Sequence, residues 1–283
     1  MKKQLILVSA GIVLLFALFL FGRTTGNKSL AAAEKTEGSS VKAFDVMEYI
    51  NLEKVKLTPN QYIIVTKLDK SLVATNSSVN KIEANLALAA FWKDSAKSFE
   101  PYAFYISEGS KLDNSEKNLT FAARIFLNNL RAEKDEVKLN WETTSAINLF
   151  ERASKLNPDN DDLKIGLGSC YIYGKGRNGN SQETMQGIQQ LLSVVRKDSN
   201  NMQAQMMLGV GGLVSGQFDK SIERLNKVVT LQPQNAEAVA YLADAYAGKG
   251  DKANAVKWYN VSKRLLNNPH YTEEVDERIK TLK

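Results

Sequence analysis

The side chains that most often perform covalent chemistry or bind metals are scarce in this sequence. There is one cysteine, Cys170, and one histidine, His270. A single cysteine excludes an intramolecular disulfide, and one residue of each kind excludes the Cys/His clusters that bind zinc. The acidic pairs Asp161-Asp162 and Glu273-Glu274 are typical of helix starts, where carboxylates interact favourably with the helix dipole. We therefore expect no enzymatic activity, no metal and no cofactor.

Two glycine-rich stretches invite comparison with nucleotide-binding turns. Gly209-Val210-Gly211-Gly212 resembles a dinucleotide-binding turn but lacks the preceding strand and the correct third glycine. The stretch from Gly174 to Asn180 lacks the Gly-Lys-Ser/Thr order of a phosphate-binding loop. We interpret the first as a site of close helix packing. The second reads as a loop, either passive or in contact with a partner.

The net charge of +6 is concentrated at the N-terminus. Residues 1–28 carry Lys2, Lys3, Arg23 and Lys28 and no acidic residue, which leaves about +2 on the other 255 residues. A nucleic-acid-binding protein needs lysines and arginines clustered on one face, and the sequence shows no such cluster. We therefore expect no nucleic-acid partner.

Small residues beside leucine recur in the C-terminal half at regular spacing. The pairs Leu167-Gly168, Leu208-Gly209 and Leu242-Ala243 are separated by 41 and 34 residues. A second set of small residues recurs at spacings of 41, 34 and 34: Ala146, Gly187, Ser221 and Ala255. Small residues at fixed positions allow two helices to cross closely. The pattern therefore predicts repeated helix hairpins.

These landmarks closely resemble the tetratricopeptide repeat (TPR) family, whose 34-residue unit is a pair of antiparallel helices. The resemblance implies an all-α, right-handed α-solenoid. Clear repeats are expected at 161–201, 202–235 and 236–269, weaker repeats at 79–115 and 116–160, and a capping helix at 270–283. Residues 43–78 are expected to form N-terminal capping helices. Thr58-Pro59-Asn60-Gln61 predicts a helix start with a capping box, and Ala132–Asn140 predicts a long charged loop.

The resemblance also implies where a partner binds, because the first helices of tetratricopeptide units line a groove for peptides. The positions expected to face this groove are Asp162, Ile165, Ser169, Ile172, Tyr173, Gln203, Met206, Val210, Leu213, Glu237, Ala240 and Asp244. Its middle is apolar, which favours a hydrophobic peptide or helix. Alternatively, these side chains are buried by neighbouring helices or by the chain's own N-terminal helices. The Lys, Asn and Arg of the chaperone-binding members, which hold a terminal carboxylate, are absent.

The first residues predict a transmembrane anchor. Gln4–Gly22 is a run of nineteen residues without charge, and as a helix it spans roughly 28 Å, close to the hydrocarbon thickness of a bilayer. A cleaved signal peptide has a shorter apolar core followed closely by a small-x-small site, whereas here Ala31–Ala33 lies far beyond Phe21. We expect an anchor at 1–23 and a flexible linker at 24–42. The flanking charges are nearly balanced, and we favour a body outside the cytoplasm, which in a bacterium is the periplasm.

The sequence thus predicts a membrane-tethered scaffold that binds a protein or peptide partner, with assembly of envelope proteins as the role that the resemblance implies. The alternative is a structural subunit whose repeats self-associate into a homo-oligomer or remain within a larger membrane complex.

Overall fold

Most helices of this protein begin at a short polar side chain that accepts hydrogen bonds from the first free backbone amides. In the computed structural model, these capping residues are Asp45, Thr58, Ser115, Asp135, Asn160, Asn201, Asn235 and Asp251. The structure describes residues 43–178 and 181–282. Within these ranges the secondary structure is helical and contains no strand, as the all-α prediction requires.

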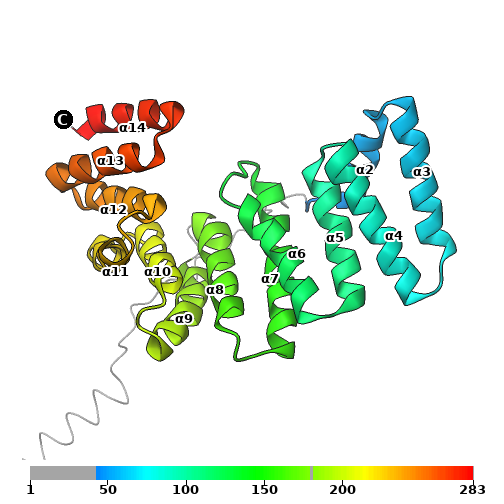
Figure 1. The fold of residues 1–283 in the computed structure, drawn as a ribbon, viewed down its shortest axis with the longest axis horizontal. Helices are drawn as coiled ribbons and strands as arrows, with labels where there is room; N and C mark the ends of the chain where they lie inside the picture. The colour runs from blue at the N-terminus through cyan, green and yellow to red at the C-terminus, as the bar shows by residue number, and fades with distance from the viewer. Residues whose placement is uncertain (1–42, 179–180, 283) are drawn as a thin grey trace, which may run out of the picture. The chain divides into compact units, whose positions relative to one another are not determined.

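The helices from Ser78 onward are paired into hairpins (Figure 1). The pairs are α4 (Ser78–Ala90) with α5 (Phe99–Asp113), α6 (Glu116–Asn129) with α7 (Glu136–Leu156), α8 (Asp161–Cys170) with α9 (Ser181–Lys197), α10 (Met202–Val214) with α11 (Phe218–Leu231), and α12 (Ala236–Lys249) with α13 (Lys252–Leu266). Each hairpin packs against the next one along the chain. Packing between successive units is the property that defines an α-solenoid.

The first helices of successive hairpins form a row, in which α6 contacts α8, α8 contacts α10, and α10 contacts α12. We call the side formed by these four helices the first-helix surface. The sequence predicts that a partner binds on this surface.

Further helices flank the hairpins at both ends. α2 (Val46–Val55) packs against α5, and α3 (Pro59–Ala74) packs against α4. At the other end, α14 (Pro269–Leu282) packs against α13 and buries Val275 and Ile279 beside Tyr259. An amphipathic helix that covers the last hairpin is what a solenoid needs at its open end.

The predicted start of α3 is confirmed in detail. Thr58 caps the helix, Pro59 occupies its first position, and the side chain of Gln61 accepts a hydrogen bond from the Thr58 backbone amide at 3.0 Å. The Gln61 amide also donates to the backbone carbonyl of Ser95 at 2.9 Å. The capping box therefore fixes the helix start and also links it to the end of the next helix.

Two segments differ from the predicted loops. α7 begins at Glu136, because Asp135 accepts hydrogen bonds from the amides of Val137 and Lys138, so the predicted loop Ala132–Asn140 is shorter than expected. The stretch predicted as a loop from Gly174 also starts as helix. Tyr171–Lys175 forms a π-helical turn, η2, that continues α8, and Gly176–Asn178 forms a 3₁₀ turn, η3.

Small residues occupy the closest helix crossings, as predicted. Ala146, Ser221, Ala243 and Ala255 are fully buried. Gly168 of α8 and Gly187 of α9 face each other, and a Cβ atom placed on Gly187 would lie 2.7 Å from the Gly168 carbonyl oxygen. Such a distance is well inside van der Waals contact, so the hairpin α8–α9 closes only because both residues lack a side chain.

We expect Gly187→Ala to destabilise the protein by about 1–3 kcal/mol, because the new methyl group meets backbone that cannot rotate away. This cost exceeds the gain of up to about 1 kcal/mol that alanine brings to a helix interior. Chemical denaturation measures the difference. The matched control is Gly109→Ala in α5, where the added methyl group would lie 3.4 Å from its nearest neighbour, Asn85 Cβ. Gly109→Ala should be neutral or stabilising; equal losses for both variants would contradict the tight crossing.

The predicted anchor 1–23 and linker 24–42 lie outside the described residues. Among the residues that are described, no helix combines the length and the apolar character needed to cross a membrane.

Candidate protein-binding surface

Two of the predicted groove residues of α8, Ile165 and Ser169, are buried, whereas Asp162 at the start of the helix is exposed. Ile165 and Ser169 are at most 5% exposed, and the Ser169 hydroxyl donates to the Ile165 carbonyl at 2.7 Å. Ser169 therefore satisfies its own hydrogen-bonding need within the helix. Neither side chain is free to contact a partner in this conformation.

The predicted residues of α10 divide between two packing clusters. Val210 is buried in the cluster that contains Ile165 and Ile172. Met206 and Leu213 are partly buried and pack toward α11 and α12. Of the two alternatives that the sequence leaves open, burial by neighbouring helices therefore holds for Ile165, Ser169 and Val210. Met206 and Leu213 keep part of their surface exposed.

The predicted residues of α12 are more accessible. Ala240 is half-buried. Asp244 accepts hydrogen bonds from Tyr259 Oη at 2.6 Å and from Arg278 Nη1 at 3.1 Å, so its carboxylate holds the capping helix α14. Burial raises the pKa of the Asp244 carboxyl, while the Tyr259 and Arg278 hydrogen bonds act in the opposite direction. Asp244 thus stabilises the packing of the capping helix.

Tyr173 and Glu237, two further predicted residues, belong to a cluster that joins distant hairpins. The guanidinium of Arg131, in the turn after α6, lies 5.4 Å from the centre of the Tyr173 ring and 5.6 Å from that of Tyr241 in α12. Arg131 also forms an ion pair with Glu237, and the two tyrosine hydroxyls lie 3.1 Å apart. These distances are those of cation–π contacts. The cluster connects the second of the five hairpins with the last across the first-helix surface.

The backbone of the turn that carries Arg131 is also held by hydrogen bonds from η3. Arg177 of η3 donates from Nη1 to the carbonyls of Leu130 at 2.8 Å and Glu133 at 2.9 Å. Neither Arg131 nor Tyr241 was predicted from the sequence. Tyr241 follows Glu237 by four residues, a spacing that places both on one helix face. Arg131 has no local signal, because its partners are 42 to 110 residues away in sequence.

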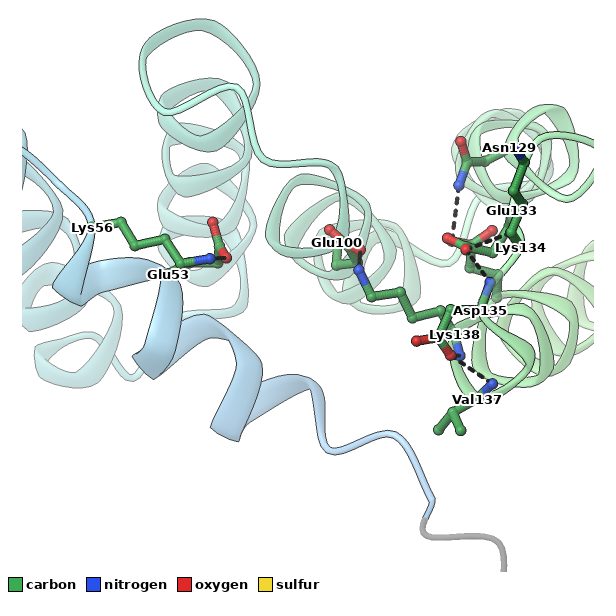
Figure 2. A network of polar contacts seen from close by, with 10 residues as sticks. Glu53, Lys56, Glu100, Asn129, Glu133, Lys134, Asp135, Val137 and Lys138 are labelled. Carbon is green, nitrogen blue, oxygen red and sulfur yellow. Dashed lines mark hydrogen bonds and ion pairs between the residues drawn. The ribbon is translucent and has the colours of Figure 1, made fainter.

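A second polar network lies inside the hairpin α6–α7 (Figure 2). Glu142 is fully buried, and its Oε1 accepts from Asn129 Nδ2 at 2.9 Å. Its Oε2 is also buried, and none of the described residues provides a hydrogen-bond partner for it. Burial raises the pKa of the Glu142 carboxyl to about 8, and the negative charges of Glu133 and Glu100 act in the same direction. Glu142 is therefore mostly protonated at neutral pH.

Next to it, an ion pair fastens the N-terminal helices to α7. Lys138 forms an ion pair with the largely buried Glu100 of α5 (Figure 2). The same ammonium lies 4.7 Å from the centre of the Tyr49 ring of α2. The carboxylate of Glu100 is thus paired with a cation. The carboxyl of Glu142, by contrast, forms no ion pair with any of the described side chains.

Cys170 and the glycine-rich stretch Gly209–Gly212, which were considered above for chemical roles, take part in helix packing. Cys170 is buried in the core, and burial raises the pKa of its thiol, which disfavours the reactive thiolate. Gly209 packs against Leu225, and Gly212 packs against Ser221, whose hydroxyl donates to the Gly209 carbonyl at 2.7 Å. This is the close helix packing predicted for that stretch. Within residues 43–178 and 181–282, no group of His, Cys, Asp and Glu is arranged to hold a metal ion.

Comparison with known proteins supports the repeat prediction. A family model described as tetratricopeptide repeat matches residues 213–267. This range runs from the end of α10 to the end of α13. It therefore includes α12–α13, whose repeat was also clear in the sequence.

Two curated relatives match parts of the chain. The BBSome complex member BBS4 of Bos taurus is 27% identical over 159 residues, which are 53% of this chain and 29% of that protein. Cellulose synthase operon protein C of Escherichia coli K12 is 40% identical over 62 residues, which are 22% of this chain and 5% of that protein. The aligned segments thus span less than a third of the length of these relatives.

Several solved structures of helical-repeat proteins are similar at low identity. MamA from Desulfovibrio magneticus is 19% identical, with a TM-score of 0.47, over 66% of this chain and 96% of the other. YrrB, described as a TPR protein with an unusual peptide-binding site, is 15% identical, with a TM-score of 0.45, over 74% and 97% of the two chains. PilW, a type IV pilus biogenesis factor, is 17% identical, with a TM-score of 0.46, over 71% and 93%.

Proposed function

We propose that this protein is a membrane-tethered tetratricopeptide scaffold that binds another protein through its first-helix surface. The observation that carries this proposal is the row α6, α8, α10 and α12, which presents exposed side chains such as Asp162 and Gln203 above a buried apolar core. A rigid row of helices positions several contacts without ordering a loop, which reduces the entropic cost of binding. The relative BBS4 is itself a member of a protein complex.

Tethering rests on the uncharged run Gln4–Gly22. Confinement to a membrane raises the effective concentration of the solenoid toward partners in the same membrane, so a modest affinity is sufficient. The body then lies on the extracytoplasmic side, where recruitment or assembly of envelope proteins is the corresponding role. We expect the intact protein to stay in the membrane pellet during alkaline extraction; release into the supernatant would refute the anchor.

The partner surface is tested by site-specific photocrosslinking of the full chain in its native membrane. A photoreactive residue is placed at Gln203 and at Ala240 on the first-helix surface, and at the exposed positions Glu223 and Thr230 of α11 as matched controls. We expect one crosslinked species from the first pair and none from the controls. Equal crosslinking at all four positions would contradict a specific surface. The variants Val210→Asp and Ile165→Asp are unsuitable, because both side chains are buried.

A second function is favoured by a different part of the molecule. Large apolar side chains are exposed on the N-terminal helices α2 and α3 and at the start of α4: Leu52, Val55, Ile63, Val73 and Val79. Several large apolar side chains exposed on neighbouring helices are a feature of proteins that contact other proteins. They favour a structural subunit that self-associates or stays within a larger complex.

Light scattering of the full chain in detergent separates the two functions. A stable dimer that Ile63→Lys converts to a monomer would support the structural subunit. A monomer that still yields the crosslinks at Gln203 and Ala240 would support the scaffold.

A further inference from the structure

Tyr173, Tyr241 and Glu237 form a small site for a cation, which we call the tyrosine cage. The two rings lie within 5.6 Å of the guanidinium carbon that they face, and a carboxylate closes the third side. Aromatic faces attract cations through their quadrupole, and a carboxylate adds charge and a hydrogen-bond acceptor. This is a set of groups that recognises a positively charged side chain.

The cage is held in place by groups other than its occupant. Both rings pack against the buried cluster of Ile172 and Val210, and their hydroxyls contact each other at 3.1 Å. Glu237 and Tyr241 are one turn apart on α12, so the helix sets their relative position. The cage should therefore keep its arrangement when the cation leaves.

The occupant, Arg131, is placed so that it can leave. Its side chain is 48% exposed, and it comes from a turn outside a helix. The backbone of that turn is held separately by Arg177 through the Leu130 and Glu133 carbonyls. Rotation of the Arg131 side chain thus empties the cage without unfolding the turn.

The shape of the site favours arginine over lysine. A guanidinium is planar and weakly hydrated, so it can stack on aromatic rings while its edge donates to a carboxylate, whereas an ammonium is a compact and strongly hydrated charge. Arg131 uses both abilities at once: it faces two rings, and its Nη1 points to Glu237.

We propose that the tyrosine cage is the site for an arginine side chain of the partner peptide, and that Arg131 occupies it as an internal substitute in the free protein. This proposal rests on the scaffold function above and adds the chemical class of the partner. An arriving arginine exchanges one set of contacts for an equivalent set, and it frees the Arg131 charge on the first-helix surface. Partners without an accessible arginine do not displace Arg131 from the tyrosine cage, so Arg131 contributes to specificity.

The proposal is tested with short peptides in place of the unidentified partner. The probes are acetyl-Gly-Gly-Arg-Gly-Gly-amide and the same peptide with citrulline, which keeps the shape of arginine without its charge. The full chain in detergent micelles carries ¹³C-labelled tyrosine rings, and the signals of Tyr173 and Tyr241 are assigned with Tyr173→Phe and Tyr241→Phe. Binding is followed by NMR at constant ionic strength.

We expect the arginine peptide to shift both ring signals in Arg131→Gln, and the citrulline peptide to bind at least about tenfold more weakly. Wild-type protein should bind the arginine peptide roughly 5- to 30-fold more weakly than Arg131→Gln, because the internal arginine must first leave. Glu237→Gln in the Arg131→Gln background should reduce the preference for arginine over citrulline, because only the contribution of the two tyrosine rings remains. The other tyrosine signals report whether each variant is folded, and Arg131→Lys serves as a milder variant if Arg131→Gln is not.

Equal binding of the two peptides to folded Arg131→Gln would overturn the arginine site, as would equal affinity of wild type and Arg131→Gln. The scaffold function is scored separately by the photocrosslinks at Gln203 and Ala240. If the crosslinks persist but the cage shows no preference for arginine, the scaffold function is supported and the partner is recognised by other chemical groups. Arginine-selective binding without a crosslinked partner would support the arginine site and refute the scaffold function.

Discussion

Glu142→Gln is expected to stabilise the protein at pH 9 by roughly 3–5 kcal/mol and to leave its stability at pH 5 nearly unchanged. The reason is the burial of Glu142 inside the hairpin α6–α7, where one carboxyl oxygen accepts from Asn129 and no described residue pairs with the other. Glutamine has nearly the same shape and can keep the contact with Asn129, but it never carries the charge. The replacement therefore removes only the cost of ionisation.

The direction of the pH dependence follows from the two pKa values of Glu142. Burial raises the pKa of this carboxyl from 4.5 to about 8, so the folded protein binds its proton more tightly than the unfolded chain does. The stabilisation from this proton is complete below about pH 4.5, and it is lost as the pH rises to about 8. Wild-type stability should fall across this window, whereas the curve for Glu142→Gln should be flatter.

Urea denaturation between pH 5 and 9 measures both curves, and Glu151→Gln is the matched control. Glu151 lies on the same helix, nine residues later, but is exposed to solvent, so its replacement should keep the slope of the wild type. Parallel curves for wild type and Glu142→Gln would show that Glu142 is already ionised in the folded protein.

The second large effect is expected at Gly174, where η2 packs against α7. A methyl group at this position would overlap Oγ1 and Cγ2 of the buried Thr143. Thr143 is held by a hydrogen bond from Oγ1 to the Leu139 carbonyl at 2.6 Å, so it cannot rotate away without losing that bond. We expect Gly174→Ala to lower the free energy of unfolding by about 2–3 kcal/mol.

A double-mutant cycle attributes this loss to the contact. In the background of Thr143→Ala, which removes both overlapping atoms, Gly174→Ala should cost about 1–2 kcal/mol less than in wild type. Thr144 provides the control, since its hydroxyl makes the same kind of bond to the Asn140 carbonyl at 2.8 Å but its side chain is exposed. Thr144→Ala should leave the cost of Gly174→Ala unchanged. A stable Gly174→Ala single variant would show that η2 is not packed tightly on α7.

The helix hairpins were predictable because their signals are local and repeat along the chain. Small residues such as Gly187 and Ser221 recur at fixed spacing, since each marks the same close crossing in its own hairpin. The start of α3 was predictable for a similar reason, because Thr58 and Gln61 satisfy backbone groups within four residues. Patterns of this kind depend on neighbouring residues and hardly at all on the rest of the fold.

The candidate site was predictable only in outline. Tyr173 and Glu237 were mapped to the first-helix surface, and both contribute to the tyrosine cage. Ile165 and Val210 were mapped to the same surface but are buried, because apolar residues on a helix face pack on the next helix whenever it is close enough. Residue type alone does not separate an apolar binding surface from an apolar packing surface.

What the sequence by itself determined is the class of architecture: helices, their pairing into hairpins, and the residues at the closest crossings. The tertiary structure decided which long-range groups meet. It placed Gly174, the first residue of the glycine-rich stretch, in a π-helical turn against Thr143. It also paired Asp244 with Arg278 of the capping helix and brought Arg131 to the two tyrosines. The physical reason is that backbone hydrogen bonds and helix caps are satisfied locally, whereas cation–π contacts, ion pairs and burial depend on the spatial stacking of successive hairpins.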